Sequence, residues 1–202
     1  MVDILPAVLP KNFSDLKQRL ESLQGIAPVV QIDLVGTNIL AGHEAIPLWE
    51  EFDFEIDIML PQPEAEVRQC IDIGAARIVV HASAPTAHQA LEILQETRGG
   101  DYAVEVGIAL AAHDMLEVLK NFDRLYDYVQ VMGIDRIGKQ GEPPDPHHHE
   151  ILLIKELRRA YPELLIQVDG AVAVHPRELV EAGANRLIVG SAIVNAEDPQ
   201  AG

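Results

Sequence analysis

Residues 165–192 read LIQVDGAVAVHPRELVEAGANRLIVGSA. The stretch opens with an apolar run at 165–169, turns at a glycine, passes through an amphipathic segment at 177–181 and ends in a second apolar run at 187–190. Short apolar runs that flank a segment with helical spacing are typical of strand–helix–strand units in a parallel sheet. The stretch therefore predicts one β/α unit followed by the next strand.

The same pattern recurs along the whole chain. Near-continuous apolar runs indicate strands buried on both faces, as in an α/β protein with a parallel sheet. Eight such runs predict one closed (β/α)8 TIM barrel with a short final helix at about 193–201. The predicted strands are residues 4–9, 29–35, 54–59, 77–81, 103–109, 128–133, 165–169 and 187–190. The predicted helices are residues 14–23, 45–51, 64–73, 86–96, 114–122, 149–160 and 177–181.

An open doubly wound sheet is the structural alternative. It would normally carry a glycine-rich phosphate turn directly after the first strand, where this chain reads Pro10-Lys11-Asn12-Phe13. The insertion at 134–148, between the sixth and seventh predicted strands, contains Gly138 and Gly141 together with three prolines. Long irregular loops are often functional, and barrel chemistry lies at the carboxyl ends of the strands. We therefore expect this loop on the active face.

Composition limits the classes of protein to consider. A chain of 202 residues with 48% apolar composition fills one domain, residues 1–202. The net charge of −17 excludes extended contact with nucleic acid or an acidic membrane surface. No apolar run approaches the ~20 residues of a membrane span, and residues 1–6 lack the basic start and long apolar middle of a signal peptide, so we expect a soluble cytoplasmic protein. The single cysteine, Cys70, is expected to be buried.

Two aspartates stand at strand ends. Asp33 lies near the end of the second predicted strand and Asp169 at the end of the seventh. These strands are three positions apart around a closed barrel, so two carboxylates there can approach a substrate from different sides. They could act as general base and general acid, provided burial raises at least one pKa toward neutrality. The alternative is that each aspartate caps the turn that follows it.

Two glycine turns at the end of the chain indicate a phosphate site. Gly170 and Ala171 follow the seventh strand, and Gly190 and Ser191 follow the eighth, where many barrels hold phosphate. Because the acidic chain repels a phosphorylated ligand, such a site must be local and built from backbone N–H groups. The alternative is a pair of ordinary strand-to-helix turns.

These stretches resemble the ribulose-phosphate 3-epimerase family across most of the chain. The matching pieces include residues 32–34, 57–61, 80–82, 107–110 and 131–132, and the strongest is 168–193. The resemblance implies a sugar-phosphate substrate and a ribulose-phosphate-binding type of barrel. It also implies that Gln31, Met59, His81, Met132 and Gly138 lie in the substrate site. Because the final helix is short, we expect a partner subunit to cover the exposed edge, as in a homo-oligomer.

The resemblance also implies a metal that this chain lacks the residues to hold. The family binds one ion through a histidine and an aspartate on the second strand, a histidine on the third and an aspartate on the seventh. The aspartates are Asp33 and Asp169, but we place Gln31 and Met59 at the histidine positions. An amide and a thioether are poor ligands for a borderline ion such as zinc. We therefore expect no metal and no other cofactor, with Gln31 and His81 as replacement hydrogen-bond donors.

The triplet His147-His148-His149 could indicate a metal site. Adjacent side chains on a helix point about 100° apart, so three consecutive histidines cannot converge on one ion. The preceding Asp145-Pro146 is typical of a helix start, which places the histidines in a solvated first turn. We favour this second interpretation.

The leading hypothesis is an isomerase-class enzyme, a metal-independent or metal-impaired sugar-phosphate epimerase that uses Asp33 and Asp169 for proton transfer. One alternative is a homologue that binds phosphometabolites without turnover. Another is a lyase or decarboxylase of the same barrel superfamily, which usually needs a lysine near the reacting carbon, and no predicted strand ends in lysine. A redesigned barrel also remains open, although the irregular loop counts against it.

Overall fold

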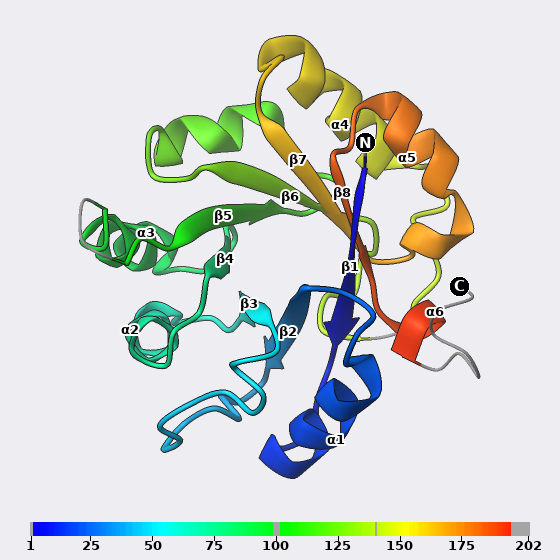
Figure 1. Cartoon of the computed structure of the whole chain (residues 1–202). Coiled ribbons are helices and arrows are strands. Elements are labelled where there is room, and N and C mark those ends of the chain that lie inside the picture. Colours follow the sequence, from blue (N-terminus) through cyan, green and yellow to red (C-terminus); the bar gives the residue numbers. More distant parts are fainter. Residues whose placement is uncertain (1, 99–101, 140, 195–202) are drawn as a thin grey trace.

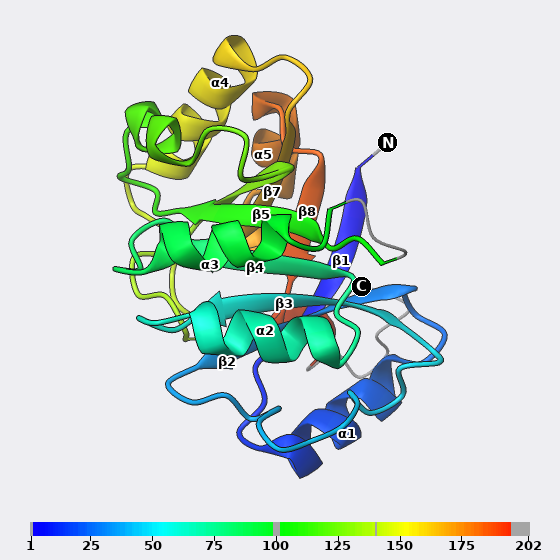
Figure 2. The same cartoon turned by 90° about the vertical axis from the view of Figure 1, so that its left-hand side faces the viewer.

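Eight parallel strands close into a barrel in this computed structural model, which describes residues 2–98, 102–139 and 141–194. Each strand pairs with the next along the chain, and the first pairs with the last. Figure 1 shows the strands at the centre with the helices around them, and Figure 2 shows helices α2 and α3 lying along the outside of the sheet. The predicted α/β class and TIM-barrel fold are confirmed.

The elements follow the predicted order. The strands are β1 (Asp3–Val8), β2 (Val29–Val35), β3 (Asp53–Met59), β4 (Arg77–His81), β5 (Glu105–Leu110), β6 (Tyr128–Met132), β7 (Leu165–Asp169) and β8 (Arg186–Val189). The α-helices are α1 (Phe13–Leu23), α2 (Glu64–Asp72), α3 (Ala87–Gln95), α4 (His149–Ala160), α5 (Pro176–Ala182) and α6 (Ser191–Val194). Two 3-10 helices, η1 (Leu116–Phe122) and η2 (Val172–Val174), complete the set.

Two helix predictions were wrong in detail. The helix predicted at 45–51 is a series of turns, because Pro47 interrupts a segment too short to nucleate a helix and Leu48 adopts a positive φ of 61°. The helix predicted at 114–122 is the tighter 3-10 form and begins at Leu116. Most of the final helix predicted at 193–201 lies outside the described residues. Its described part, α6, begins at Ser191.

The main core lies between the barrel and the helices around it. Leu16, Leu20 and Leu23 form the fully buried stripe of α1, spaced three or four residues apart as predicted. Cys70 in α2 is also fully buried, and burial, followed by the charge of Glu66, raises the pKa of its thiol to about 12. Within the described residues, every helix is too short or too polar to cross a membrane.

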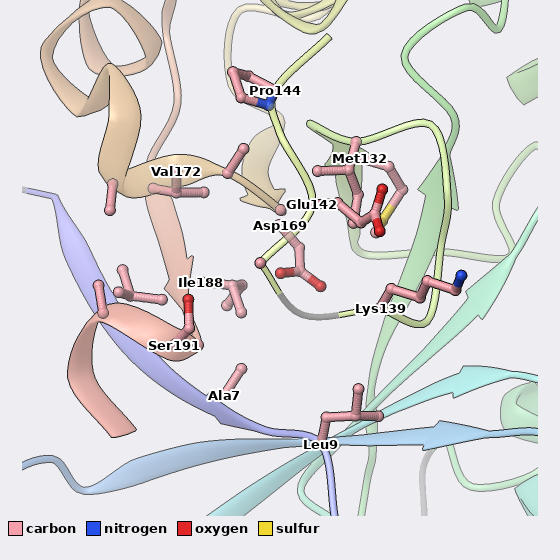
Figure 3. Close-up of a pocket in the computed structure, with 18 of the residues that line it drawn as sticks. Ala7, Leu9, Met132, Lys139, Glu142, Pro144, Asp169, Val172, Ile188 and Ser191 are labelled. Carbon is pink, nitrogen blue, oxygen red and sulfur yellow. The ribbon is translucent and has the colours of Figure 1, made fainter. Parts of the chain in front are cut away.

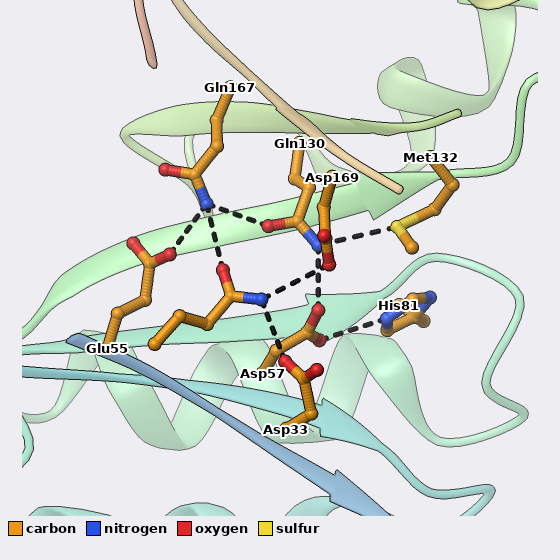
Figure 4. Close-up of polar contacts among 9 residues, drawn as sticks. Asp33, Glu55, Asp57, His81, Gln130, Met132, Gln167 and Asp169 are labelled. Atoms are coloured by element: carbon orange, nitrogen blue, oxygen red, sulfur yellow. Dashed lines mark hydrogen bonds and ion pairs between the residues drawn. The ribbon is translucent and has the colours of Figure 1, made fainter. Parts of the chain in front are cut away.

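One layer of the barrel interior is polar. Gln31, Glu55, Gln130 and Gln167 have no exposed surface. Figure 4 shows Glu55, Gln130 and Gln167 pointing toward one another inside the barrel. The Gln167 amide donates to Glu55 at 2.6 Å and to Gln130 at 2.7 Å. The Tyr128 hydroxyl donates to the other oxygen of Glu55 at 2.7 Å. Buried polar groups are stable only when they are hydrogen-bonded, so this network is part of the folded core.

Tyr128 fits inside the barrel only because β5 carries a glycine opposite its ring. A Cβ atom at Gly107 would lie 2.6 Å from the ring carbon Cζ. We predict that Gly107→Ala lowers the free energy of unfolding by about 1–3 kcal/mol, as overpacked core substitutions do. Urea denaturation measures this loss.

Tyr128→Leu provides the control for that test, because the smaller side chain leaves room for the added methyl group. The double variant should then lose less free energy of unfolding than the two single variants lose together. Strict additivity would contradict the proposed clash.

Candidate active site

A cavity of about 350 Å³ opens at the carboxyl ends of the strands. Figure 3 shows the carboxylate of Asp169 inside it, with Ser191 on one side and Lys139 on the other. Nine of the eleven residues predicted for the site line this cavity: Asp33, Met59, Met132, Gly138, Asp169, Gly170, Ala171, Gly190 and Ser191. The other two, Gln31 and His81, are buried next to the carboxylates. The fold therefore brings the predicted residues together, and their individual roles stay predictions.

Three carboxylates meet at the floor of the site. One oxygen from each of Asp33, Asp57 and Asp169 lies within 4.8 Å of the others. The sheet register pairs Asp33 with Asp57 across β2 and β3, whereas Met59 pairs with Val35 one layer nearer the cavity mouth. Asp57, which the sequence pattern did not single out, is therefore the third-strand residue that faces the two aspartates. The assignment of Met59 to that position was wrong.

Gln31 joins the two predicted catalytic carboxylates. Its side-chain nitrogen donates to Asp33 Oδ1 at 2.8 Å and to Asp169 Oδ2 at 3.1 Å (Figure 4). Residues 31 and 33 share a face because alternate residues of a strand point the same way. The Gln31 amide therefore links the end of β2 to the end of β7. Gln31 does not line the cavity.

Asp57 is held from two sides. Its Oδ1 lies 3.0 Å from His81 Nε2, and its Oδ2 accepts a hydrogen bond from Gln130 at 2.7 Å (Figure 4). His81 ends β4, so its ring reaches the carboxylate from the neighbouring strand. His81 is thus linked to the site through Asp57 and does not itself line the cavity.

Burial and mutual repulsion shift the acidity of this cluster. Burial raises the pKa of Asp33 well above its usual range, and the charges of Asp169 and Asp57 raise it further. Burial and the charge of Asp57 raise the pKa of Asp169 to about 7, although Gln31 and His81 oppose the shift. Burial lowers the pKa of His81, but the adjacent Asp57 outweighs that effect and the net shift is upward. Both aspartates therefore keep their protons to a higher pH than exposed aspartates do.

The residues as arranged do not fit a resident metal ion. Zinc sites are built mainly from imidazole and thiolate ligands, and the converging atoms of this cluster are all carboxylate oxygens. Hard ions such as Mg²⁺ accept such oxygens. Here, however, the Gln31 amide nitrogen already lies between Asp33 and Asp169, and both oxygens of Asp57 are hydrogen-bonded. A bound ion would have to displace these donors.

The predicted phosphate turns form one wall of the cavity. Gly170 has a φ of 94°, and a Cβ there would lie 2.8 Å from the side chain of Ile134. Ala171 also adopts a left-handed conformation, with φ at 51°, immediately before η2. Gly190 and Ser191 line the same cavity at the end of β8. The close approach of β6 to this turn needs a glycine as well, because a Cβ at Gly133 would lie 2.3 Å from the Gly170 carbonyl oxygen.

The loop between β6 and α4 forms the opposite wall, as predicted for the active face. Gly138, Lys139, Gly141 and Glu142 line the cavity. Gly138 has a φ of 82°, and a Cβ there would lie 2.7 Å from Val35 at the end of β2. The loop is therefore packed across the mouth of the barrel.

The histidine triplet lies at the start of α4, where a helix start was predicted. Both oxygens of Asp145 accept backbone N–H groups, from His147 at 3.1 Å and from His149 at 2.9 Å. Only His149 lies in the first turn of the helix, because His148 takes a left-handed conformation that precedes it. None of the three side chains lines the cavity, so the triplet is separate from the site described above.

Comparison with protein families gives a clear result. The model of the "Ribulose-phosphate 3 epimerase family" matches residues 3–194. Ribulose-phosphate 3-epimerase of Schizosaccharomyces pombe is 31% identical, over 98% of this chain and 89% of that protein. The Bacillus subtilis protein of the same name is 29% identical, over 98% of this chain and 94% of that protein.

Solved structures share the fold at lower sequence identity. A ligand complex of KGPDC from Streptococcus mutans superposes with a TM-score of 0.74 at 14% identity, covering 99% of this chain and 93% of that one. The structure of 3-hexulose-6-phosphate synthase gives a TM-score of 0.70 at 17% identity, with 99% and 95% coverage. At these identities the likeness shows the fold alone.

Fold and site together define a parallel β/α-barrel protein with paired acidic groups at the mouth of the barrel. Within that class, the chain belongs to the ribulose-phosphate 3-epimerase family, because the family model covers nearly its whole length.

We predict that Asp169→Asn changes the pH dependence of stability. Between the unfolded-state pKa of about 4 and the folded-state pKa of about 7, the folded protein binds more protons than the unfolded chain. Stability therefore falls as pH rises through this window. Asparagine is neutral at every pH. Relative to the wild type, Asp169→Asn should therefore leave the free energy of unfolding unchanged near pH 4, about the unfolded-state pKa, and raise it by up to about 4 kcal/mol above pH 7.

Urea unfolding at a series of pH values tests this expectation. Asp72→Asn, at an exposed position in α2, is the matched control and should follow the wild-type curve. The prediction fails if Asp169→Asn follows that same curve.

Proposed function

We propose that this protein epimerises a ketose phosphate at the carbon next to the carbonyl group, with Asp33 and Asp169 as the proton-transfer pair. The observation that carries the proposal is the placement of both carboxylates in one cavity, bridged by the Gln31 amide, with the Gly170 and Gly190 turns lining the same cavity. The family to which the chain belongs, and the relatives named ribulose-phosphate 3-epimerase, support this choice of reaction.

Epimerisation needs one ionised and one protonated group. A carboxylate removes the proton from carbon, an enediolate forms, and a carboxylic acid returns a proton on the opposite face. Two like-charged carboxyl groups in a buried site retain a proton between them near neutral pH, since their repulsion opposes double ionisation. Burial is the main cause of the raised pKa values of Asp33 and Asp169, and the charges of neighbouring carboxylates add to it. The pair thus supplies both required states.

Gln31 and His81 support the pair without touching the substrate. Gln31 fixes the carboxylate positions through its two hydrogen bonds, and His81 places a titratable cation beside Asp57. A positive charge beside Asp57 would offset the negative charge that develops in the enediolate. We assign both as positioning residues.

The phosphate group of the substrate is assigned to the two turns at the end of the barrel. Gly170, Ala171, Gly190 and Ser191 line the same wall of the cavity as Val172 at the start of η2. Backbone N–H groups at such turns attract anions despite the acidic character of the whole chain. The chain's residence in the cytoplasm and its assembly into a homo-oligomer remain predictions from the sequence.

Proton–deuterium exchange in D₂O tests the proposed chemistry directly. The purified protein should exchange the proton next to the ketone of a pentulose or hexulose phosphate. Asp33→Asn and Asp169→Asn should each slow the exchange by about 10²- to 10⁴-fold, the usual contribution of a general acid or base. Asp72→Asn is the control and should match the wild type. Absence of exchange with all these substrates, with or without added divalent metal, would overturn the proposal.

A second experiment tests whether the site works without a metal. Because the Gln31 amide lies between the two carboxylates, we expect exchange activity to survive extensive chelation and dialysis. The double variant Gln31→His with Asp57→His introduces two imidazoles at this level of the barrel. It should acquire a bound divalent ion and become sensitive to chelation. Loss of wild-type activity on chelation, restored by one added ion, would refute metal independence.

A further inference from the structure

Five of the eight histidines gather outside the cavity, around the starts of α4 and α5. The rings of His113 and His149 have centroids 4.4 Å apart, and those of His148 and His175 are 4.9 Å apart. His147 lies beside His149, with centroids 5.5 Å apart. The proposed epimerase chemistry uses none of these residues, so the group needs a separate explanation.

Three residues of this region converge on one point. Glu150 Oε1 lies 2.9 Å from His175 Nε2 and 3.5 Å from His148 Nδ1. The three ligand atoms lie within 4.8 Å of one another. His148 and Glu150 belong to the start of α4, whereas His175 directly precedes α5. The cluster therefore links two segments that are 25 residues apart in sequence.

These spacings suit a tetrahedral metal ion. Ligand atoms about 2.0–2.1 Å from a tetrahedral zinc ion are about 3.3 Å from each other. The two measured separations, 2.9 and 3.5 Å, lie on either side of that value. Two imidazoles and one carboxylate are also a ligand set that zinc uses, with water in the fourth position.

An unpartnered carboxylate oxygen in the cluster points to the same conclusion. The Glu150 side chain is only 1% exposed, yet its Oε2 atom has no hydrogen-bond partner among the described residues. A buried carboxylate is strongly unfavourable unless it is paired or coordinates a cation. His148, whose side chain is 52% exposed, leaves the cluster open to solvent for an entering ion.

The neighbouring group of His113, Asp145 and His149 is of a different kind. Asp145 accepts two backbone N–H groups and contacts the ring of His149 at 2.6 Å, so its carboxylate serves as the cap of α4. His113 in turn contacts Asp135 at 3.0 Å. The polar atoms of this group therefore already have partners within the chain. We use His113 as a control position for the cluster of His148, Glu150 and His175.

We propose that His148, Glu150 and His175 form a binding site for one zinc-class divalent ion. The ion would fasten the start of α4 to the turn that carries Gly170, Ala171 and η2, because His175 directly follows η2. The site is separate from the cavity and does not depend on the proposed epimerase activity.

Metal titration of the full-length, metal-stripped chain tests the site. Co²⁺ reports tetrahedral coordination through its visible absorption, and Zn²⁺ should displace it with one ion per chain. His148→Ala, His175→Ala and Glu150→Gln should each weaken Zn²⁺ binding at least about tenfold. Removing a residue that only hydrogen-bonds to a metal ligand already lowers affinity by about that factor, and these residues are proposed as ligands themselves. Zn²⁺ should raise the Tm of the wild type but not of His175→Ala.

The controls separate this site from its neighbours. His147→Ala and His113→Ala should leave the affinity unchanged, and Asp33→Asn should do so because the interior carboxylates are a different cluster. If His175→Ala fails to fold, the His148→Ala variant provides the test of metal binding, because the His148 side chain is half exposed and contributes little to the core. Absence of Co²⁺ binding at micromolar metal, or binding unaffected by His148→Ala, would overturn the proposal and leave an ion pair between Glu150 and His175.

Discussion

The structure depends on holding three carboxylates close together inside a closed barrel. Asp33, Asp57 and Asp169 come from three strands, and their buried charges repel one another. The Gln31 amide offsets this repulsion by donating to two of them, and His81 pairs with the third. Burial, together with this repulsion, raises the pKa values of Asp33 and Asp169, as the proposed proton transfer requires. The arrangement that the proposed proton transfer needs therefore lowers the stability of the folded protein.

The polar layer below the carboxylates explains why they hold their positions. Gln167 donates to Glu55 and Gln130, and Gln130 donates to Asp57, so the hydrogen bonds run continuously from the middle of the barrel to the floor of the cavity (Figure 4). A side chain fixed by a second set of hydrogen bonds keeps its geometry better than one held by packing alone. Glycine at position 107 makes room for Tyr128, which completes this layer.

The turn between β7 and α5 takes part in both proposals. Gly170 and Ala171 line the cavity, where a phosphate group is proposed to bind. A few residues later, His175 reaches Glu150 at the start of α4. An ion at this second position would stiffen the phosphate turn from outside the cavity. The anion site and the cation site would then lie on opposite sides of the same short segment.

The sequence by itself determined the order of the strands, the barrel class and the two strand-end aspartates. Apolar periodicity and the type of residue at a strand end are local properties, so they can be read without knowing the partners of a strand. Only the tertiary structure identified Asp57, because its role depends on the register that sets it opposite Asp33. The same holds for the cluster of His148 and His175, which comes together only when α4 and α5 pack side by side. Side chains far apart in sequence become neighbours through barrel closure and helix packing, and no local pattern records that contact.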